Sequence, residues 1–566
     1  MKLGTWKIAI LFVLVTGCIP QRHKHSKTYF KKMERFNQYI QRNGLEAKGY
    51  QTSGVEWCMA IEREGRRMGN KTVRGGVLAD EMGLGKTTQM IGLILSNFKA
   101  RTLIVVPRAL LEQWDNVMIE TLGHTCVLYH GKKASLDELI RAPIVLTTYG
   151  TLAQLKTKPR KGEPLVFGDL HKVTWDRVIF DEAHHLRNRN TRSHKAGVSV
   201  KATHKWLVTG TPIQNSITDF YGLCEVLGVE QEFYSKRENI ESIAANLIMK
   251  RTKEGVGLEL PPLNRHVIEV EWENEAERQL AEDIHAHLTF SQVAIREENG
   301  FKNLGLHHFA MLQRARQACI NMDLLAGSVK TLIELGVMED SEFIEQALQY
   351  HSKLDKVIET ILERKENGKG KLIFCHYHGE MTSVLKSLTE SGMKCARFDG
   401  KTSQAKRQEL LSDESLDAIV LQIQTGCEGL NLQRFSEVFF VSPNWNPAVE
   451  DQAIARCHRI GQEEATDVFS FRMTSFDGDA FTRTMDMYTR DLQQVKRLAM
   501  KTVDAERTEI IREKGVGEEM KEVCAICLEC QHENTCHHLE CGHYFHRTCL
   551  EGWFKKQKTC PMCRAN

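Results

Sequence analysis

Eight cysteine and histidine side chains near the C-terminal end of the sequence have the spacing of metal ligands. They form four pairs, with one or two residues between partners: Cys524 and Cys527, Cys541 and His543, His546 and Cys549, and Cys560 and Cys563. Thiolates and imidazoles in such pairs suit tetrahedral Zn²⁺, and eight ligands make two closed structural sites. Because a segment this short has too small a core to fold unaided, we expect zinc to supply its folding free energy.

A second group of residues has the chemistry of a phosphate site. Residues 80–87 read Asp-Glu-Met-Gly-Leu-Gly-Lys-Thr. A loop containing Gly83 and Gly85 before a helix lets backbone N–H groups surround phosphates, while Lys86 supplies a cation and Thr87 a hydroxyl for Mg²⁺. Asp80 stands where the generic loop has its first glycine, so this pattern alone also fits an ordinary surface turn.

A pair of acids supports the phosphate interpretation. The apolar run 178–180 is followed directly by Asp181 and Glu182. The first carboxylate at such a strand end can hold Mg²⁺, directly or through water, and Glu182 can orient the attacking water. The alternative is that the acids only cap the next helix. Because both elements occur in the order expected of an ATPase, we interpret them as one site for ATP and Mg²⁺.

The elements around these residues follow a repeated rhythm, in which short β-rich runs alternate with helical stretches. The runs lie at 103–106, 144–147, 178–180 and 206–209, and again at 372–374, 418–421 and 438–441. Short buried strands between helices indicate parallel sheets, so the sequence predicts two α/β lobes. Residues 273–350 and 481–521 are charged and periodic without strand signals, and are predicted to be helical.

The length, the net charge and the N-terminal residues limit the functions that the chain can have. A chain of 566 residues is longer than one hydrophobic core usually supports, so we expect several domains. The net charge of +3 is small, so any nucleic-acid binding requires a local basic groove. The apolar run 8–15 after Lys2 and Lys7 resembles a secretory signal. An ATPase needs nucleotide, however, and zinc thiolates need reducing conditions, so we expect an intracellular protein without a membrane partner. The run is then a buried segment or reflects a start codon placed too early.

Several ordered blocks extend this picture to a known family. They are Tyr50-Gln51-x2-Gly54-Val55-x-Trp57, residues 80–87, Leu103–Pro107, Asp181–His184, Thr209–Asn215, Gly426-x2-Gly429-Leu430-Asn431-Leu432, Trp445-Asn446-Pro447 and Gln452–Gln462. Together these blocks resemble the motifs of Swi/Snf-type superfamily-two ATPases over residues 49–471. That family uses Asp-Glu-x-Gly-Leu-Gly-Lys-Thr in its phosphate loop, which accounts for Asp80.

The resemblance implies two RecA-like parallel-sheet lobes with helical insertions, and it implies roles for individual residues. Gln51 would recognise adenine, and Arg456 and Arg459 would reach the transferring phosphate from the second lobe. Arginines of this kind contribute about 10³ to 10⁵ in rate, so hydrolysis would wait for the lobes to close. The implied nucleotide and Mg²⁺ contacts, besides Gln51, are Gly83, Gly85, Lys86, Thr87, Thr88 and Asp181, with Glu182 catalytic.

The implied partner is duplex DNA, held by its phosphates without sequence readout. We expect its contacts in loops that follow Pro107 and Thr147 and in loops near His376 and Thr425. Residues 311–319 also resemble the helix that Swi/Snf proteins carry between the lobes, although Asn321-Met322 departs from the usual His-Pro. An RNA-directed helicase remains an alternative, because other superfamily-two members with an Asp-Glu-Ala-His box act on RNA.

The terminal zinc pattern resembles a RING finger of the two-histidine type. That resemblance implies a cross-braced topology, in which Cys524, Cys527, His546 and Cys549 hold one ion and Cys541, His543, Cys560 and Cys563 hold the other. RING fingers of ligases dock a ubiquitin-conjugating enzyme, here through Ile526, Trp553 and Pro561, and contact ubiquitin, here through Arg564. The alternative is an inert zinc clip. Other nearby candidates are predicted to be non-ligands: Cys530, His532, Cys536, His537 and His538.

The motor and the RING together resemble DNA-damage-tolerance translocases and the Swi/Snf-like proteins of large DNA viruses. In the former the RING lies between the lobes, so their ubiquitination target is not carried over. We predict an ATP-dependent duplex DNA translocase coupled to a ubiquitin ligase, in the nucleus or a viral DNA-replication compartment. The alternative of another class is a ligase with a nucleotide-gated DNA tether. The predicted domains are an N-terminal segment (1–44), a first lobe (45–255), a helical insertion (256–350), a second lobe (351–480), a helical linker (481–521) and a RING (522–566).

Overall fold

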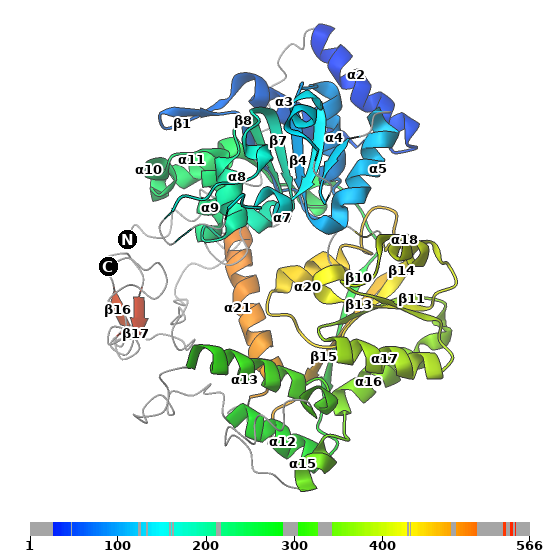
Figure 1. The fold of residues 1–566 in the computed structure, drawn as a ribbon. Coiled ribbons are helices and arrows are strands. Elements are labelled where there is room, and N and C mark those ends of the chain that lie inside the picture. The colour runs from blue at the N-terminus through cyan, green and yellow to red at the C-terminus, as the bar shows by residue number, and fades with distance from the viewer. Residues whose placement is uncertain are drawn as a thin grey trace, which may run out of the picture. The chain divides into compact units, whose positions relative to one another are not determined.

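Two parallel β-sheets with surrounding helices organise the computed structural model (Figure 1). Both sheets, the phosphate loop, the acidic end of β7 and the helix after the second sheet fall within the described residues. The structure describes residues 27–46, 48–122, 126–131, 134–157, 160, 163–210, 217–286, 304–326, 342–426, 430, 432–476, 483–505, 536–538, 544–546 and 550.

The first sheet has seven strands in the order β5-β6-β4-β7-β8-β3-β9, and all its pairings are parallel. Every residue of the central β4 and β6 is buried, as expected for aliphatic strands covered on both faces. The four runs predicted here are confirmed, except that Thr209 lies one residue beyond β8. The strands are β3 (Gly75–Leu78), β4 (Thr102–Val106), β5 (Val127–Tyr129), β6 (Ile144–Thr148), β7 (Trp175–Asp181), β8 (Ala202–Val208) and β9 (Ile248–Met249).

Helices and a short hairpin complete this lobe. They are α2 (Lys27–Arg42), α3 (Gly49–Glu64), α4 (Lys86–Ser96), α5 (Leu111–Leu122), α6 (Leu136–Arg141), α7 (Tyr149–Leu152), α8 (Arg192–Ser199), α9 (Ile217–Leu227), α10 (Gln231–Tyr234), α11 (Arg237–Leu247) and the hairpin of β1 (Arg66–Met68) and β2 (Lys71–Val73). Helix α2 packs on α4, where a Cβ at Gly92 would lie 2.7 Å from the Phe36 ring. Helix α2 therefore contributes to the core of the first lobe.

The apolar run 8–15 lies outside the described residues. Among the residues that the structure does describe, none of the helices has both the length and the apolar composition of a membrane span.

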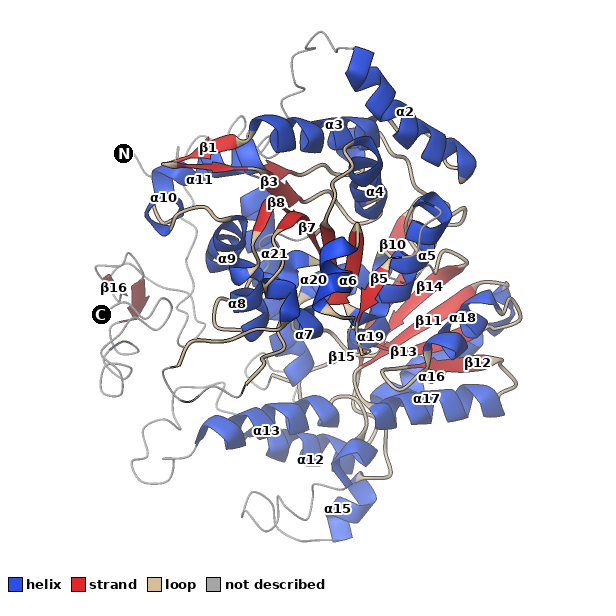
Figure 2. Ribbon diagram, turned by 45° about the horizontal axis from the view of Figure 1, so that its top comes forward, coloured by secondary structure: helices blue, strands red, loops and turns tan. Residues whose placement is uncertain are grey.

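The second sheet has six parallel strands in the order β10-β15-β14-β11-β13-β12 (Figure 2). The predicted strands at 372–374 and 418–421 are confirmed, and the third one ends at Phe440 rather than at Val441. The elements are β11 (Gly370–Cys375), β12 (Cys395–Phe398), β13 (Ala418–Gln422), β14 (Phe435–Phe440), β15 (Thr466–Met473), α16 (Ser352–Glu363), α17 (His378–Glu390), α18 (Gln404–Ser412), α19 (Ile423–Gly426) and α20 (Pro447–Ile454).

One strand of this sheet corrects the prediction of a helical insertion over 256–350. Strand β10 (Leu263–Val270) lies in that range and pairs with β15 over eight residues. It is an edge strand in which Asn264, Arg265, His266 and Val267 are all exposed, so it lacks the buried aliphatic signal of the other strands. Elsewhere in the described insertion the predicted helical character is seen in α12 (Glu275–Ala286), α13 (Leu304–Ala318) and α15 (Glu342–Ala347).

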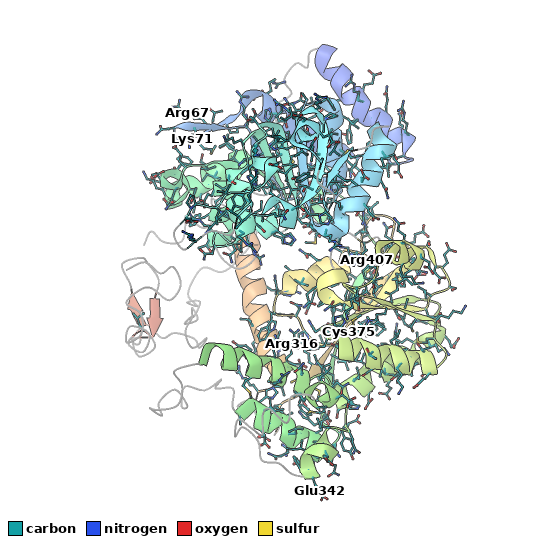
Figure 3. All side chains as sticks on the ribbon, viewed as in Figure 1. Arg67, Lys71, Arg316, Glu342, Cys375 and Arg407 are labelled. Atoms are coloured by element: carbon teal, nitrogen blue, oxygen red, sulfur yellow. The ribbon has the colours of Figure 1, made fainter. Side chains whose placement is uncertain are left out.

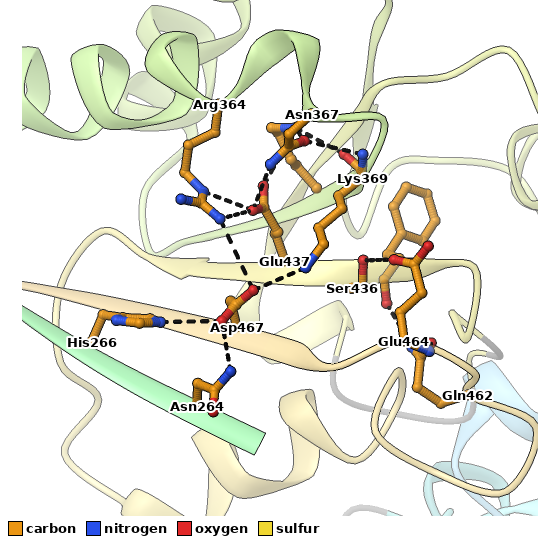
Figure 4. A network of polar contacts seen from close by, with 12 residues as sticks. Asn264, His266, Arg364, Asn367, Lys369, Ser436, Glu437, Gln462, Glu464 and Asp467 are labelled. Atoms are coloured by element: carbon orange, nitrogen blue, oxygen red, sulfur yellow. Dashed lines mark hydrogen bonds and ion pairs between the residues drawn. The ribbon is translucent and has the colours of Figure 1, made fainter. Parts of the chain in front are cut away.

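A polar network fastens β10 to β15 (Figure 4). Asp467 accepts hydrogen bonds from Asn264 Nδ2 at 3.0 Å and from Lys369 Nζ at 3.1 Å, and His266 Nε2 lies 3.2 Å from the same carboxylate. Burial raises the pKa of Asp467, but these contacts outweigh burial and hold the pKa at about 2. The carboxylate therefore stabilises this edge of the sheet in its charged form.

The helix after the second lobe is α21 (Met485–Ala505), which confirms the described part of the helical linker. Asp486 forms a buried ion pair with Lys353, and Arg497 donates to Asp451 Oδ2 at 2.9 Å. Helix α21 is thus tied to the second lobe at both α16 and α20. Farther along the chain, β16 (Cys536–His538) and β17 (Tyr544–His546) form an antiparallel pair.

Candidate active site at the phosphate loop

The loop between β3 and α4 has the backbone that a phosphate site needs. Gly83 and Gly85 have φ values of 93° and 74°, which lie in the left-handed region that glycine adopts without strain. Gln51 packs against this loop and donates from Nε2 to the Leu84 carbonyl at 3.3 Å. A Cβ at Gly85 would lie 2.4 Å from the same Nε2 atom. The local sequence therefore fixes both the turn and its contact with Gln51.

Lys86, Thr87 and Thr88 form the first turn of α4. Lys86 Nζ donates to the carbonyls of Asp80 at 2.8 Å and Glu81 at 3.3 Å, so its ammonium points back over the loop. Burial lowers the pKa of Lys86, while the nearby acids oppose that shift. In this position, Lys86 could exchange the carbonyls of Asp80 and Glu81 for a phosphate group bound in the loop.

The two acids follow at the end of β7. Asp181 accepts a hydrogen bond from Trp114 Nε1 at 2.8 Å, and Tyr149 donates to its carbonyl at 2.6 Å. Burial and the charge of Glu182 raise the pKa of Asp181 to about 6. Burial also raises the pKa of Glu182, but His184 and Arg456 outweigh it and hold that pKa at about 2. The two neighbouring carboxylates thus have different environments.

Glu182 has a strained backbone. Its φ is 49°, and no other non-glycine residue in the described part of the chain has a positive φ. Such strain costs of order 1–3 kcal/mol and collects at functional sites. The turn aims the side chain of Glu182 toward the second lobe, where Arg456 lies 3.8 Å away.

Both predicted arginines reach this site from the segment after α20. That helix begins at Pro447 because Asn446 accepts from the Ala448 N–H at 3.1 Å and proline suits the first helical turn. Gln462 then closes the segment, donating to the carbonyls of Gln433 at 2.8 Å and Phe435 at 3.1 Å. The side chains of Asn446 and Gln462 therefore fix the backbone at the two ends of the segment that carries the arginines.

Arg459 lies beside the phosphate loop. A Cβ at Gly83 would approach Arg459 Cβ to 3.4 Å. The Nε atom of Arg459 is buried and has no hydrogen-bond partner among the described residues. Burial and the neighbouring charge of Arg456 lower the pKa of Arg459. A buried guanidinium nitrogen without an acceptor, next to a loop of glycines and a lysine, fits an anionic phosphate group.

Motif analysis missed two distant partners of the site, Arg251 and Trp114. Asp80 is fully buried, accepts from Gln89 Nε2 at 2.9 Å and from Arg251 Nε at 2.9 Å, and forms a bidentate ion pair with Arg251. Asp80 therefore clamps the loop rather than binding phosphate. Trp114, the donor to Asp181, is the second. Arg251 and Trp114 both lie far from the loop in sequence, and no local sequence pattern indicated their contacts.

The loops expected to bind nucleic acid are placed only in part. Thr147 is buried and donates to the Tyr129 carbonyl at 2.8 Å. His376 is also buried, with Arg316 (labelled in Figure 3) donating toward its Nε2 at 2.6 Å. Neither side chain therefore reaches the surface. The side chain of Thr425 lies outside the described residues, as do residues 211–215, 429 and 431.

The predicted zinc site lies almost entirely outside the described residues. Of the eight predicted ligands, His546 alone has a described backbone, in β17 opposite Cys536. The predicted docking residues Ile526, Trp553 and Pro561 and the predicted ubiquitin contact Arg564 also lie outside.

Comparison with protein families matches three stretches of the chain. Residues 50–324 match the SNF2-related domain, residues 352–461 the helicase conserved C-terminal domain, and residues 522–564 the Ring finger domain. The chain carries Swi/Snf-type helicase-like ATPase domains and a C-terminal RING finger. The resemblance read from its motifs is thereby confirmed. The ATPase domains imply ATP and Mg²⁺, and the RING finger implies zinc.

Curated relatives of this Swi/Snf-type chain come from viruses, plants and animals. The "Probable global transactivator" of Orgyia pseudotsugata multicapsid polyhedrosis virus is 28% identical, over 74% of this chain and 85% of the relative. "DNA repair protein RAD5B" of Arabidopsis thaliana is 26% identical, over 70% and 43%. "Chromodomain-helicase-DNA-binding protein 8" of Danio rerio is 25% identical, over 78% and 18%. The chain thus spans most of the viral relative and less than half of the other two.

Among solved structures, the Sulfolobus solfataricus SWI2/SNF2 ATPase core in complex with dsDNA matches 81% of this chain and 96% of that chain. The two are 21% identical, with a TM-score of 0.35.

Proposed function

We propose that this protein hydrolyses ATP to move along duplex DNA and ubiquitinates proteins through its RING finger. The observation that carries the motor half is the meeting of Arg456 and Glu182 at 3.8 Å, because it joins the second lobe to the acidic strand end of the first. In a nucleotide motor, residues that complete the site from a second lobe make turnover depend on lobe closure.

Each side chain has a role that follows from its position. Lys86 and Thr87 bind the phosphates, and Gln51 binds adenine beside the loop. Asp181 holds Mg²⁺, which supplies charge neutralisation at the phosphate oxygens when it is bound. Glu182 orients the attacking water, helped by the low pKa that keeps it ionised. Arg456 and Arg459 offset the negative charge that develops on the transferring phosphate.

Closure and reopening of the lobes form the stroke. Loss of the γ-phosphate removes the anion shared by Lys86, Arg456 and Arg459, so their mutual repulsion favours separation of the lobes. Duplex DNA held by its phosphates on both lobes is thereby advanced without base readout. Protein displacement and remodelling on DNA are the expected consequences. The names of the chromodomain and DNA-repair relatives support this reading.

The RING half rests on the Ring finger match over residues 522–564. We infer that two zinc ions, held by the eight cysteine and histidine ligands, fold this segment. Ile526, Trp553 and Pro561 dock a ubiquitin-conjugating enzyme, and Arg564 contacts ubiquitin. A nuclear or viral DNA-replication compartment suits both halves, and the named viral and plant relatives support it.

Steady-state ATP hydrolysis tests the motor. The full chain is assayed without nucleic acid and with duplex DNA, single-stranded DNA or RNA, beside a Lys86→Ala control. Strong stimulation by duplex DNA, lost in Lys86→Ala, is the expected result. Turnover that DNA does not alter would favour the nucleotide-gated tether, and stronger stimulation by RNA together with strand separation would favour the RNA helicase.

Self-ubiquitination with a panel of conjugating enzymes tests the ligase. Ile526→Ala is expected to abolish chain formation, while Lys86→Ala leaves it largely intact because the RING does not use the ATPase site. Unchanged activity of Ile526→Ala with every enzyme would show that the docking surface is misassigned.

A further inference from the structure

The segment that leaves the first lobe runs alongside the phosphate loop. After β9, the backbone N–H of Ala79 donates to the Met249 carbonyl at 2.7 Å, and the N–H of Glu81 donates to the Arg251 carbonyl at 2.8 Å. Side chains add to this ladder, since the Lys253 N–H donates to Glu81 Oε2 at 2.8 Å. The phosphate loop and residues 249–253 therefore form one hydrogen-bonded unit.

Two residues of the chain after β9, Lys253 and Pro261, contact His458 in the arginine-bearing segment of the second lobe. Lys253 Nζ donates to the carbonyl of His458 at 3.0 Å, and His458 Nε2 lies 2.8 Å from the carbonyl of Pro261. His458 stands between Arg456 and Arg459 in the chain. Fixing its backbone therefore fixes the starting point of both arginine side chains.

The position of Lys253 is unusual for a cation. Its side chain is 15% exposed, and its nearest described carboxylate is Glu81, whose Oε1 lies 3.8 Å from Nζ. A Cβ at Gly83 would lie 3.4 Å from Lys253 Cε and equally close to Arg459 Cβ. Burial and the charges of Lys86 and Arg459 lower the pKa of Lys253, while Glu81 opposes that shift. The hydrogen-bond acceptor that the structure gives this ammonium is the His458 carbonyl.

We propose that Lys253 is a positioning residue for ATP hydrolysis, which holds the backbone of His458 so that Arg456 and Arg459 face the phosphate loop. The inference rests on the proposed ATPase function and names a residue outside the motifs that predicted it. Lys253 acts through the arginines, so its loss lowers the rate of the chemical step more than it weakens nucleotide binding. Misplacement of a catalytic group by about 1 Å costs on the order of 10²-fold in rate.

The test compares kcat and KM for ATP in Lys253→Met, Lys253→Arg and the full wild-type chain. Lys253→Met keeps the length of the side chain and removes the hydrogen bond. We expect kcat to fall by about 10²-fold and KM to change by less than about threefold, because Lys86 and Thr87 remain. Lys253→Arg retains a donor and is expected to restore part of the rate. The matched control is Lys195→Met on the exposed face of α8, which should behave as wild type.

A double-mutant cycle separates positioning from direct phosphate binding. If Lys253 acts through the two arginines, Lys253→Met has a smaller effect in an Arg459→Ala background than in wild type, so the two losses are not additive. Fully additive losses, or a raised KM with unchanged kcat, would overturn the proposal.

Amide hydrogen exchange provides a readout that does not require hydrolysis. In Lys253→Met, residues 456–462 should exchange faster than in wild type, whereas α4 should keep its protection and report an intact lobe. Unchanged exchange at 456–462 would overturn the role of Lys253. A chain that hydrolyses no ATP but shows the faster exchange would refute the proposed function and leave the positioning contact standing.

Discussion

Replacement of Arg251 by methionine should destabilise the first lobe strongly. Arg251 forms a bidentate ion pair with Asp80, whose side chain is fully buried. After the change, Asp80 keeps Gln89 Nε2 and the backbone N–H of residue 251 as donors, at 2.9 and 3.1 Å, but it has lost its counter-charge. Removing one partner of a buried ion pair costs about 3–5 kcal/mol, because the remaining charge is left uncompensated.

Thermal unfolding followed by tryptophan fluorescence measures this loss, since Trp114, Trp175 and Trp206 are buried in the first lobe. At about 2–4 °C per kcal/mol for a lobe of this size, the apparent Tm of the first lobe should fall by about 10 °C. Combining Arg251→Met with Asp80→Asn should recover much of the loss, because the amide carries no charge.

The matched control is Arg63→Met, which removes an exposed ion pair with Glu64 on the same lobe and should shift the Tm by less than about 2 °C. An equally small shift for Arg251→Met would refute the clamp. So would the absence of any rescue by Asp80→Asn, because the penalty would then not arise from an uncompensated charge.

Other predictions concern catalysis, pH and zinc. Glu182→Gln should lower kcat by about 10²- to 10⁴-fold with nucleotide binding retained, as measured by steady-state kinetics and nucleotide titration. The depressed pKa of Asp467 contributes stability that is complete above its ordinary value of 3.8 and is lost as the pH falls toward about 2. Asp467→Asn should therefore flatten the acid limb of second-lobe stability, measured by unfolding at pH 2–5. Zinc chelation should abolish self-ubiquitination and leave ATP hydrolysis in place, and loss of both activities together would show that the RING is not an independent folding unit.

Local patterns predicted the parts of the fold that local chemistry determines. The buried aliphatic strands, the glycine loop before Lys86 and the acidic end of β7 each lie within a few consecutive residues. Their side-chain types restrict the backbone strongly. Parallel pairing then brings the ends of β3 and β7 to one edge of the sheet, so the meeting of Lys86 and Asp181 could be anticipated.

The parts that were missed depend on partners distant in sequence. Strand β10 is an exposed edge strand whose partner lies about two hundred residues later, and its polar residues concealed it. The contacts of Arg251 and Lys253 form only because β9 aligns these residues beside the phosphate loop. Trp114 looks like an ordinary apolar residue of an amphipathic helix until its indole N–H meets Asp181.

We propose that ATP turnover between the two lobes drives movement along duplex DNA. Displacement of a labelled third strand from a triplex site, placed at a distance from the loading end of a duplex, tests it most directly. We expect ATP-dependent displacement that slows with distance and disappears in Lys86→Ala and Glu182→Gln. ATP hydrolysis stimulated by the same duplex, with no displacement at any distance, would contradict it.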